Sequence, residues 1–207
     1  MIRLYLVRHG QTEWNLEGRM QGNKDSPLTE LGLYQAKQLG ESLKNVNIDL
    51  VYSSSSERTM NTAKIIVGNR KVDIIPTAQL KEMNFGFWEG MTFEVIKEQY
   101  PDLYQCFWNT PHLLSDFPGE SFQQLKNRVV GFVNKIIEEN EGKDILIVTH
   151  GIVLKMLITN FKGLEIKDIF QGEILKPTSL TVVEVEKDIY NIVKCGDTEH
   201  YNIKVEE

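Results

Sequence analysis

Apolar and polar positions along the chain alternate between short apolar runs and longer amphipathic stretches. Four runs rich in β-branched residues predict strands, at residues 2–7, 49–54, 72–77 and 144–150. Apolar residues recur at helical spacing in three longer stretches, at residues 29–45, 56–68 and 120–142. Strands that alternate with helices favour a mainly parallel central sheet flanked by helices on both faces, a three-layer α/β fold.

Residues that cap helices support these boundaries. Side chains suited to the N-cap lie at the start of each helical stretch: Thr29, Ser55 or Ser56, and Ser121 in a capping box with Gln124. Gly142 is expected to close the third helix. Residues 179–196 alternate apolar and polar side chains, which predicts an antiparallel hairpin. No repeat, low-complexity tract or linker interrupts the sequence, so we expect one domain over residues 1–207.

Composition and charge narrow the classes of function. A content of 41% apolar and 25% charged residues is typical of globular proteins, and the net charge of −6 without a cluster of Lys and Arg argues against nucleic-acid or membrane-surface partners. The two cysteines, Cys106 and Cys195, are too few for a disulfide framework or a zinc site. The N-terminal apolar run is too short for a signal peptide, and the run 145–158 is broken by His150 and Lys155. We therefore expect a cytoplasmic protein.

Two of the predicted strands end in the same way, in a histidine followed by a glycine. His9 and Gly10 follow the first strand, and His150 and Gly151 follow the fourth. In an open α/β sheet, ligands bind at this edge, in crevices between strand ends and helix N-termini. Glycine after each histidine permits close approach of the backbone to a ligand. The other histidines have no such setting, and we expect both at the surface: His112 and His200.

Two arginines are expected at the same edge of the sheet. Arg8 precedes His9, and Arg58 falls in the first turn of the helix after the second strand. The guanidinium fork matches phosphate oxygens, and helix N-termini add backbone N–H groups and partial positive charge. A neutral imidazole nitrogen can attack phosphorus and form a covalent intermediate. The pattern predicts phosphoryl transfer and leaves open whether His9 or His150 is the nucleophile. Either histidine alone would be an ordinary turn residue, and Arg58 alone an ordinary residue at a helix start.

Five motifs, in this order, resemble the histidine phosphatase superfamily in its phosphoglycerate-mutase-like branch. They are LVRHGQTEWN (6–15), DSPLTELGLYQA (25–36), YSSSSERTMNTA (52–63), LKEMNFGFWEG (80–90) and VTHG (148–151). The stretches MQGNKDSPLT and THGIVLKML are most similar to the bacterial broad-specificity phosphatases of this branch. The resemblance implies that His9 is the nucleophile and becomes phosphorylated, while Arg8, Arg58 and His150 hold the phosphoryl oxygens.

The resemblance also implies roles for neutral residues and for one carboxyl group. Asn15 and Gln21 match positions that hydrogen-bond the substrate, and Gly151 supplies backbone approach beside His150. Glu82 matches the proton donor to the leaving oxygen, and the apolar MNFGFW stretch after it would help to keep a carboxyl protonated. The rival carboxylates are Glu13, Glu89 and Glu120. Of these, Glu13 and Glu120 are expected at helix N-termini.

The segment 84–120 bears on the choice between phosphatase and mutase. Phosphoglycerate mutases carry an Arg and a Tyr after the catalytic Glu and a longer basic insertion, whereas Met83 and Asn84 follow Glu82 here. Nine aromatic residues lie between positions 85 and 117, with Lys97 as the single basic residue there. We expect a lid-like excursion that buries an apolar leaving group, with core packing as the alternative for each aromatic residue. Two further cations are candidates for the rim of the pocket: Arg19 and Lys24.

The sequence thus predicts a phosphomonoesterase of broad specificity that acts on small phosphate monoesters without a metal or another cofactor. Two in-line transfers are expected, from substrate to His9 and from His9 to water. The alternatives are a cofactor-dependent phosphoglycerate mutase, a dedicated sugar-phosphate or nucleotide-loop phosphatase, and a catalytically idle phospho-binding scaffold. The presence of a nucleophile together with a proton donor argues against the scaffold, because binding alone requires neither.

Overall fold

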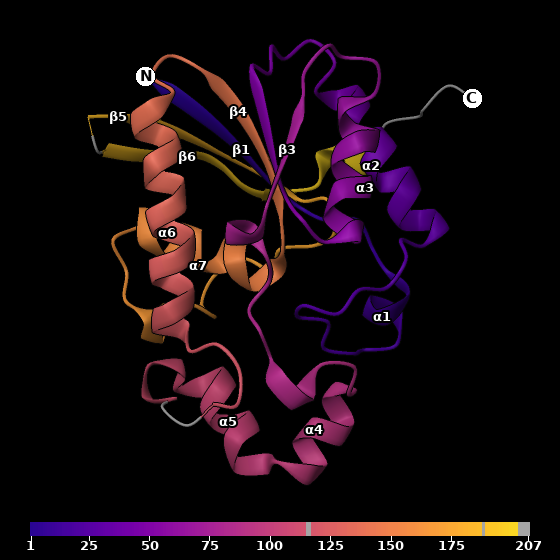
Figure 1. Cartoon of the computed structure of the whole chain (residues 1–207), viewed down its shortest axis with the longest axis vertical. Coiled ribbons are helices and arrows are strands. Elements are labelled where there is room, and N and C mark those ends of the chain that lie inside the picture. Colours follow the sequence, from indigo (N-terminus) through magenta and orange to yellow (C-terminus); the bar gives the residue numbers. More distant parts are fainter. Residues whose placement is uncertain (115–116, 188, 203–207) are drawn as a thin grey trace.

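A six-stranded sheet forms the centre of the computed structural model, which describes residues 1–114, 117–187 and 189–202 (Figure 1). In spatial order the strands are β3 (Ile74–Thr77), β2 (Leu50–Ser54), β4 (Asp144–Thr149), β1 (Ile2–Arg8), β5 (Leu180–Glu186) and β6 (Ile189–Asp197). The first four are parallel to one another, and β5 pairs antiparallel with both β1 and β6. The mainly parallel sheet and the C-terminal hairpin predicted from the sequence are confirmed.

Helices cover both faces of this sheet. The α-helices are α1 (Glu13–Leu16), α2 (Glu30–Ser42), α3 (Glu57–Val67), α4 (Phe93–Gln99), α5 (Pro101–Asn109), α6 (Phe122–Glu139) and α7 (Gly151–Phe161). Short 3₁₀ segments are η1 (Ala78–Leu80), η2 (Gly86–Trp88), η3 (Pro111–Leu113), η4 (Ile166–Asp168) and η5 (Glu199–Asn202). Because successive side chains of a strand point to opposite faces, Leu4 and Leu6 share a core with α6 and α7, whereas Tyr5 and Val7 share one with α2 and α3. The three-layer arrangement is confirmed.

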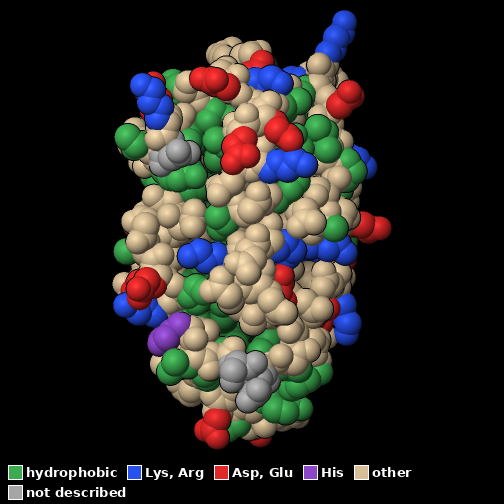
Figure 2. Space-filling view, turned by 60° about the vertical axis from the view of Figure 1, so that its left-hand side comes forward, with side chains coloured by type: hydrophobic (Ala, Val, Ile, Leu, Met, Phe, Trp, Pro, Cys, Tyr) green, Lys and Arg blue, Asp and Glu red, His purple; other side chains and the backbone are tan. Residues whose placement is uncertain are grey.

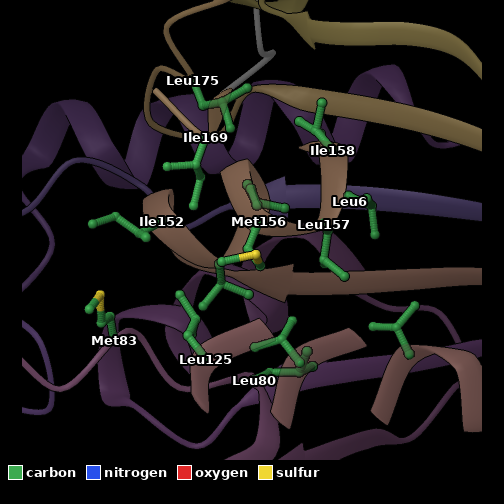
Figure 3. Close-up of a cluster of buried hydrophobic side chains, with 14 of the residues drawn as sticks. Leu6, Leu80, Met83, Leu125, Ile152, Met156, Leu157, Ile158, Ile169 and Leu175 are labelled. Atoms are coloured by element: carbon green, nitrogen blue, oxygen red, sulfur yellow. The ribbon is translucent and has the colours of Figure 1, made fainter. Parts of the chain in front are cut away.

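The core on the α6 and α7 face extends to the edge where the parallel strands end. Figure 3 shows Leu6 of β1 close to Leu157 of α7, with Leu125 of α6 and Leu80 of η1 in the same cluster. These side chains are fully buried. Burial of one such aliphatic side chain contributes about 1.5–3 kcal/mol. The packing therefore fixes α7 against the strands, and with it the residue that precedes the helix, His150.

The helix boundaries follow the predicted caps with one exception. The Thr29 hydroxyl accepts the N–H of Gly32, and the capping box of Ser121 and Gln124 is present. Ser56 is the N-cap of α3, although its side chain makes no capping bond. The prediction that Gly142 closes α6 is wrong: the helix ends at Glu139 and is capped by Asn140, whose side-chain amide donates to the Ile136 carbonyl at 2.9 Å. Gly142 lies in the following turn with φ of 81°.

The segment 84–120 forms a helical excursion between η1 and α6. It contains α4 and α5, which lie together at one end of the molecule (Figure 1); residues 115–116 are outside the described ranges. Some of its aromatic residues are core, since Trp88 is buried with its ring centroid 5.5 Å from that of Phe107 and 5.2 Å from that of Phe117. Phe87, by contrast, is 48% exposed. The excursion therefore contributes some of its aromatic residues to the core and leaves others at the surface.

Charged side chains of both signs share the surface shown in Figure 2, where lysines and arginines are interspersed with acidic and apolar residues. Within the described ranges, no helix combines the length and the apolar character needed to span a membrane. Both cysteines, Cys106 and Cys195, are free thiols.

Candidate active site

Three neighbouring strands bring their ends together at one edge of the sheet. β4 lies between β2 and β1, with Ser53 opposite Val148 and Arg8 opposite Thr149. The residues that follow β1 and β4 are His9 and His150, and their ring centroids are 5.4 Å apart. Parallel strands end at the same edge, so the repeated His–Gly pattern predicted this meeting correctly.

The ring of His9 is held in one tautomer by a backbone carbonyl. Its Nδ1 lies 2.7 Å from the Gly10 oxygen, which can only accept a hydrogen bond, so Nδ1 carries the proton and Nε2 keeps its lone pair. Burial, together with the Arg58 and Arg8 cations, holds the pKa of His9 well below its ordinary value of 6.5. The imidazole is therefore neutral at neutral pH, with a free nitrogen of the kind that a nucleophile requires.

His150 lies behind His9 and is completely buried. Its Nε2 is 2.8 Å from the Ser54 hydroxyl, at the end of β2. Burial and the nearby Arg58 cation hold the pKa of His150 well below 6.5. Within the described residues, its Nδ1 has no hydrogen-bond partner.

Two arginine side chains approach the same point: Arg58 is fully buried, and Arg8 is partly buried. Arg8 donates from Nη1 to the Leu175 carbonyl at 2.7 Å. Arg58 donates from Nη1 to the Asp25 carboxylate at 2.8 Å and from Nη2 to the Gly22 carbonyl at 2.9 Å. In the part of the chain that the structure describes, the Nε of each arginine lacks an acceptor. Both guanidinium groups thus retain a buried donor for a ligand.

A cavity of about 370 Å³ opens in front of His9. All the predicted site residues except His150 line it: Arg8, His9, Asn15, Gln21, Arg58, Glu82 and Gly151. Its apolar wall comes from the excursion and from the chain after α7: Phe85, Phe93, Trp108, Phe170, Ile174 and Leu175. The cavity therefore combines charged groups around His9 with a largely apolar wall.

The Glu82 carboxyl group lies at the N-terminus of α7. Its oxygens accept the N–H groups of Met83 at 3.0 Å, Ile152 at 3.2 Å and Val153 at 3.3 Å. Burial raises the pKa of Glu82 above its ordinary value of 4.5, although these N–H groups and two arginine cations oppose the effect. A carboxyl with a raised pKa can hold a proton for donation.

The three rival carboxylates serve other purposes. Glu13 is exposed in the first turn of α1, as predicted. Glu89 accepts backbone N–H groups from Asn23 and Phe85. Glu120, expected in a helix first turn, lies just before the α6 N-cap and pairs with Arg128. In the described chain, none of the three lines the cavity in front of His9.

Asn15 and Gln21 are held to one another through Thr12. The Asn15 side-chain oxygen accepts the N–H of Thr12 at 3.0 Å, completing the capping box of α1. Gln21 donates from Nε2 to the Thr12 hydroxyl at 2.8 Å. Both amides line the cavity in a fixed arrangement.

The two glycines after the histidines differ in what requires them. A Cβ on Gly10 would lie 2.7 Å from the Gly32 carbonyl oxygen, so packing against the start of α2 excludes a side chain. This contact, rather than approach to a ligand, requires Gly10. Gly151 lines the cavity, and a Cβ there would meet Arg8 Nε at 3.6 Å, an ordinary contact distance.

The two remaining histidines have different surroundings. His112 is exposed, as predicted. The prediction for His200 is wrong: it is 4% exposed, and its Nε2 lies 3.1 Å from the Thr178 hydroxyl. Thr178 in turn donates its N–H to the carbonyls of Arg8 and His9. The C-terminal η5 therefore contacts the site from behind.

Two further cations line the cavity, Arg19 and Lys155. Arg19, a predicted rim residue, donates from Nη1 to the Gly90 carbonyl at 2.7 Å. Lys24 does not line the cavity; its ammonium donates to the Glu89 carbonyl. Lys155 was not predicted, because it lies within an apolar helix and reaches the cavity only through the packing of α7.

Sequence analysis also missed polar partners of the predicted residues. Ser54 binds His150, Asp25 pairs with Arg58, and the Thr62 hydroxyl accepts the Gly10 N–H. All three partners lie inside the motifs quoted above, and their position in these motifs could have identified them.

Known proteins resemble the chain over nearly its whole length. A model of the histidine phosphatase superfamily (branch 1) matches residues 4–198. Phosphoserine phosphatase 1 of Hydrogenobacter thermophilus is 31% identical over 97% of this chain and 94% of that protein. The probable phosphoglycerate mutase GpmB of Salmonella paratyphi A is 37% identical over 79% of this chain and 76% of its own length. The solved structure of Bacillus stearothermophilus YhfR has a TM-score of 0.93 and 39% identity, covering 97% of this chain and 99% of that one.

Proposed function

Because the chain belongs to the histidine phosphatase superfamily (branch 1), we propose that it is a phosphomonoesterase in which His9 accepts the phosphoryl group. The state of the His9 ring carries this proposal. Its Nδ1–H is bound to the Gly10 carbonyl, which leaves Nε2 unprotonated in a ring that lines the cavity beside Arg8 and Arg58. These are the requirements for nucleophilic attack on a phosphate monoester.

Three buried nitrogen atoms around His9 support a phosphoryl ligand. Arg8 Nε, Arg58 Nε and His150 Nδ1 have no partner among the described residues. An unsatisfied buried donor costs about 1–3 kcal/mol. Phosphoryl oxygens would accept hydrogen bonds from these guanidinium donors, and their negative charge would be stabilised by Arg8 and by Arg58, which also pairs with Asp25.

In the proposed reaction, the lone pair on His9 Nε2 attacks phosphorus as the P–O ester bond breaks. Glu82 gives its proton to the departing oxygen, so the alcohol leaves neutral. A water oxygen then attacks the phosphohistidine while the Glu82 carboxylate takes the water proton. Phosphate leaves and His9 is restored. Arg8 and Arg58 supply the positive charge at the transferring group, so the proposal includes no metal ion.

The experiment that tests this function is a rapid-quench trap of the intermediate with labelled p-nitrophenyl phosphate. We expect an acid-labile, alkali-stable adduct on His9. It should be absent from His9→Ala and retained in His112→Ala, which removes an exposed histidine. An adduct on serine, or none in an active enzyme, would contradict the proposal.

We further propose that the organic part of the substrate is small and apolar-tolerant, and that specificity is broad. The aromatic rings of Phe93, Trp108 and Phe170 line the cavity beyond the phosphoryl site. Apolar walls favour leaving groups of many shapes, because they impose few directional bonds.

A second candidate substrate class carries a carboxylate beside the phosphate, as in phosphoserine or phosphoglycerate. Arg19 and Lys155 at the cavity are the observation that favours it, and two relatives are named for such compounds. Both cations already bind carbonyls, however, since the Lys155 ammonium lies 2.6 Å from the Glu173 oxygen. A panel ranked by kcat/KM distinguishes the classes, and a mutase would isomerise 3-phosphoglycerate faster than it releases phosphate.

A further inference from the structure

Glu82 lies in a stretch of chain, residues 81–85, that is neither helix nor strand. Its position therefore depends on contacts with other elements. Arg128, on α6, reaches the chain on the N-terminal side of Glu82. Its Nη1 donates to the carbonyl of Gln79 at 2.8 Å and to that of Lys81 at 2.9 Å.

The same guanidinium holds a carboxylate that reaches the other side of Glu82. Arg128 donates from Nε to Glu120 Oε1 at 2.7 Å and from Nη2 to Oε2 at 2.6 Å, a bidentate pair. The N–H of Glu120 donates to the Asn84 carbonyl at 2.8 Å, and the Asn84 N–H lies 3.4 Å from Glu120 Oε2. The backbone before Glu82 and the backbone after it are thus both bound to the Arg128–Glu120 ion pair.

This ion pair is anchored to a rigid element. Leu125 and Val129, which flank Arg128 on α6, are fully buried in the core. A second, polar cavity of about 370 Å³ is lined by Glu82 together with Arg128 and Glu120. The carboxyl group therefore has an alternative polar environment, away from His9, that it could enter if its chain shifted.

Resting on the proposed function, in which Glu82 donates the proton, we infer that Arg128 and Glu120 form a positioning pair that holds the Glu82 carboxyl within reach of the leaving oxygen. Arg128 does not line the cavity in front of His9; it acts through the backbone on both sides of Glu82. A displacement of about 1 Å in a reacting group can slow a reaction by about 100-fold. Loosening the pair should therefore impair proton donation while attack by His9 remains intact.

Leaving groups of different basicity separate these two effects. Glycerol phosphate releases an alkoxide that needs a proton, whereas p-nitrophenolate leaves readily without one. In single-turnover experiments, Arg128→Met should lower the rate of His9 phosphorylation by glycerol phosphate about 10- to 100-fold more than the rate with p-nitrophenyl phosphate. Glu120→Gln, a milder change, should act in the same direction. Arg70→Met is the matched control, because Arg70 also donates to backbone carbonyls, those of Ile66 and Val67 in α3. In this variant, the phosphorylation rates with both substrates should be unchanged.

A double-variant cycle completes the test. In a Glu82→Gln background, Arg128→Met should cause no further difference between the two substrates, because the acid is already absent. Equal slowing of both substrates by Arg128→Met and by Glu120→Gln would overturn the inference and leave the pair a structural role. If Glu82→Gln itself showed no leaving-group difference, the acid assignment would fail and the positioning role with it; phosphohistidine formation at His9 would remain separately testable by the trap.

Discussion

At the scale of single residues, a backbone carbonyl distinguishes two histidines that the sequence leaves equivalent. His9 and His150 each follow a parallel strand and precede a glycine. The Gly10 carbonyl oxygen can only accept a hydrogen bond from His9, which fixes the tautomer of His9, whereas the Ser54 hydroxyl can donate to His150 or accept from it. His9 also lines the cavity and His150 does not. These differences arise from local chain geometry, which residue types alone do not specify.

Glu82 gives a prediction about pH. A general acid works only while protonated, so kcat/KM for glycerol phosphate should fall as pH rises through the pKa of Glu82, which burial raises above 4.5. Glu82→Gln should lower kcat/KM at low pH by about 10²–10⁴-fold and remove its fall at higher pH. The measurement is a pH profile of both enzymes with this substrate and with p-nitrophenyl phosphate, for which the loss should be far smaller.

Ionisation of the substrate affects the unaltered enzyme and Glu82→Gln equally, so it cancels in the ratio of their kcat/KM values. A constant ratio across pH, or equal losses for the two substrates, would assign the proton to another group.

At the scale of elements, periodicity and caps were sufficient for most of the fold. The β-branched runs and the N-caps Thr29, Ser56 and Ser121 marked strands and helices near their observed bounds. The end of α6 was misplaced because Asn140 caps the helix before Gly142 can. The excursion was predicted as a lid-like insertion, but the bounds of its helices were not, since these helices are short and depend on aromatic packing against Phe122 and Phe170.

The C-terminal element η5 could not be placed from sequence. His200 has no apolar periodicity around it. Its burial accompanies the packing of η5 against α2 and a hydrogen-bond contact with Thr178, on a turn 22 residues earlier. Thr178 has a φ of 52°, unusual for a β-branched residue. Its N–H donates to the Arg8 carbonyl at 3.0 Å and to that of His9 at 3.2 Å. The terminal element therefore supports the strand end that carries the candidate nucleophile.

His200 gives a prediction about acid stability. Burial lowers its pKa from 6.5 to about 4, an effect that Asp197 opposes. As pH falls from 6.5 towards 4, the unfolded chain binds a proton at this residue that the folded chain does not, so the free energy of unfolding decreases. The total change is about 3 kcal/mol at most. His200→Gln cannot titrate, so its stability should fall less over this range.

Urea unfolding of both proteins between pH 7 and pH 4 measures this difference. His9 and His150 are present in both, so their titration cancels. A difference in unfolding free energy that stays constant with pH would show that folding does not lower the pKa of His200.

At the scale of the whole molecule, the cavity joins segments that no local pattern connects. The part of the cavity around His9 comes from strand ends and helix starts, and residue types and spacing predicted that Arg8, Arg58 and the two histidines meet there. The resemblance to the family, rather than spacing, indicated Asn15, Gln21 and Glu82. The apolar wall combines Phe93 and Trp108 of the excursion with Phe170 after η4, and the rings of Trp108 and Phe170 are 4.6 Å apart. The sequence could indicate aromatic content in the excursion, but it could not show which rings face the cavity and which join the core.

Trp108 tests whether this apolar wall selects substrates. Trp108→Ala should lower kcat/KM for 2-phenylethyl phosphate about tenfold, or about 1.4 kcal/mol, relative to glycerol phosphate, because only the phenyl group loses contact with the indole. Both substrates release an alkoxide, so the demand for a proton is matched. Phe87→Ala is the control, since Phe87 belongs to the same excursion, is 48% exposed and does not line the cavity; its two kcat/KM values should be unchanged. Equal losses with both substrates in Trp108→Ala would show that the indole supports the excursion without contacting the leaving group, and the apolar preference would then have to come from Phe93 or Phe170.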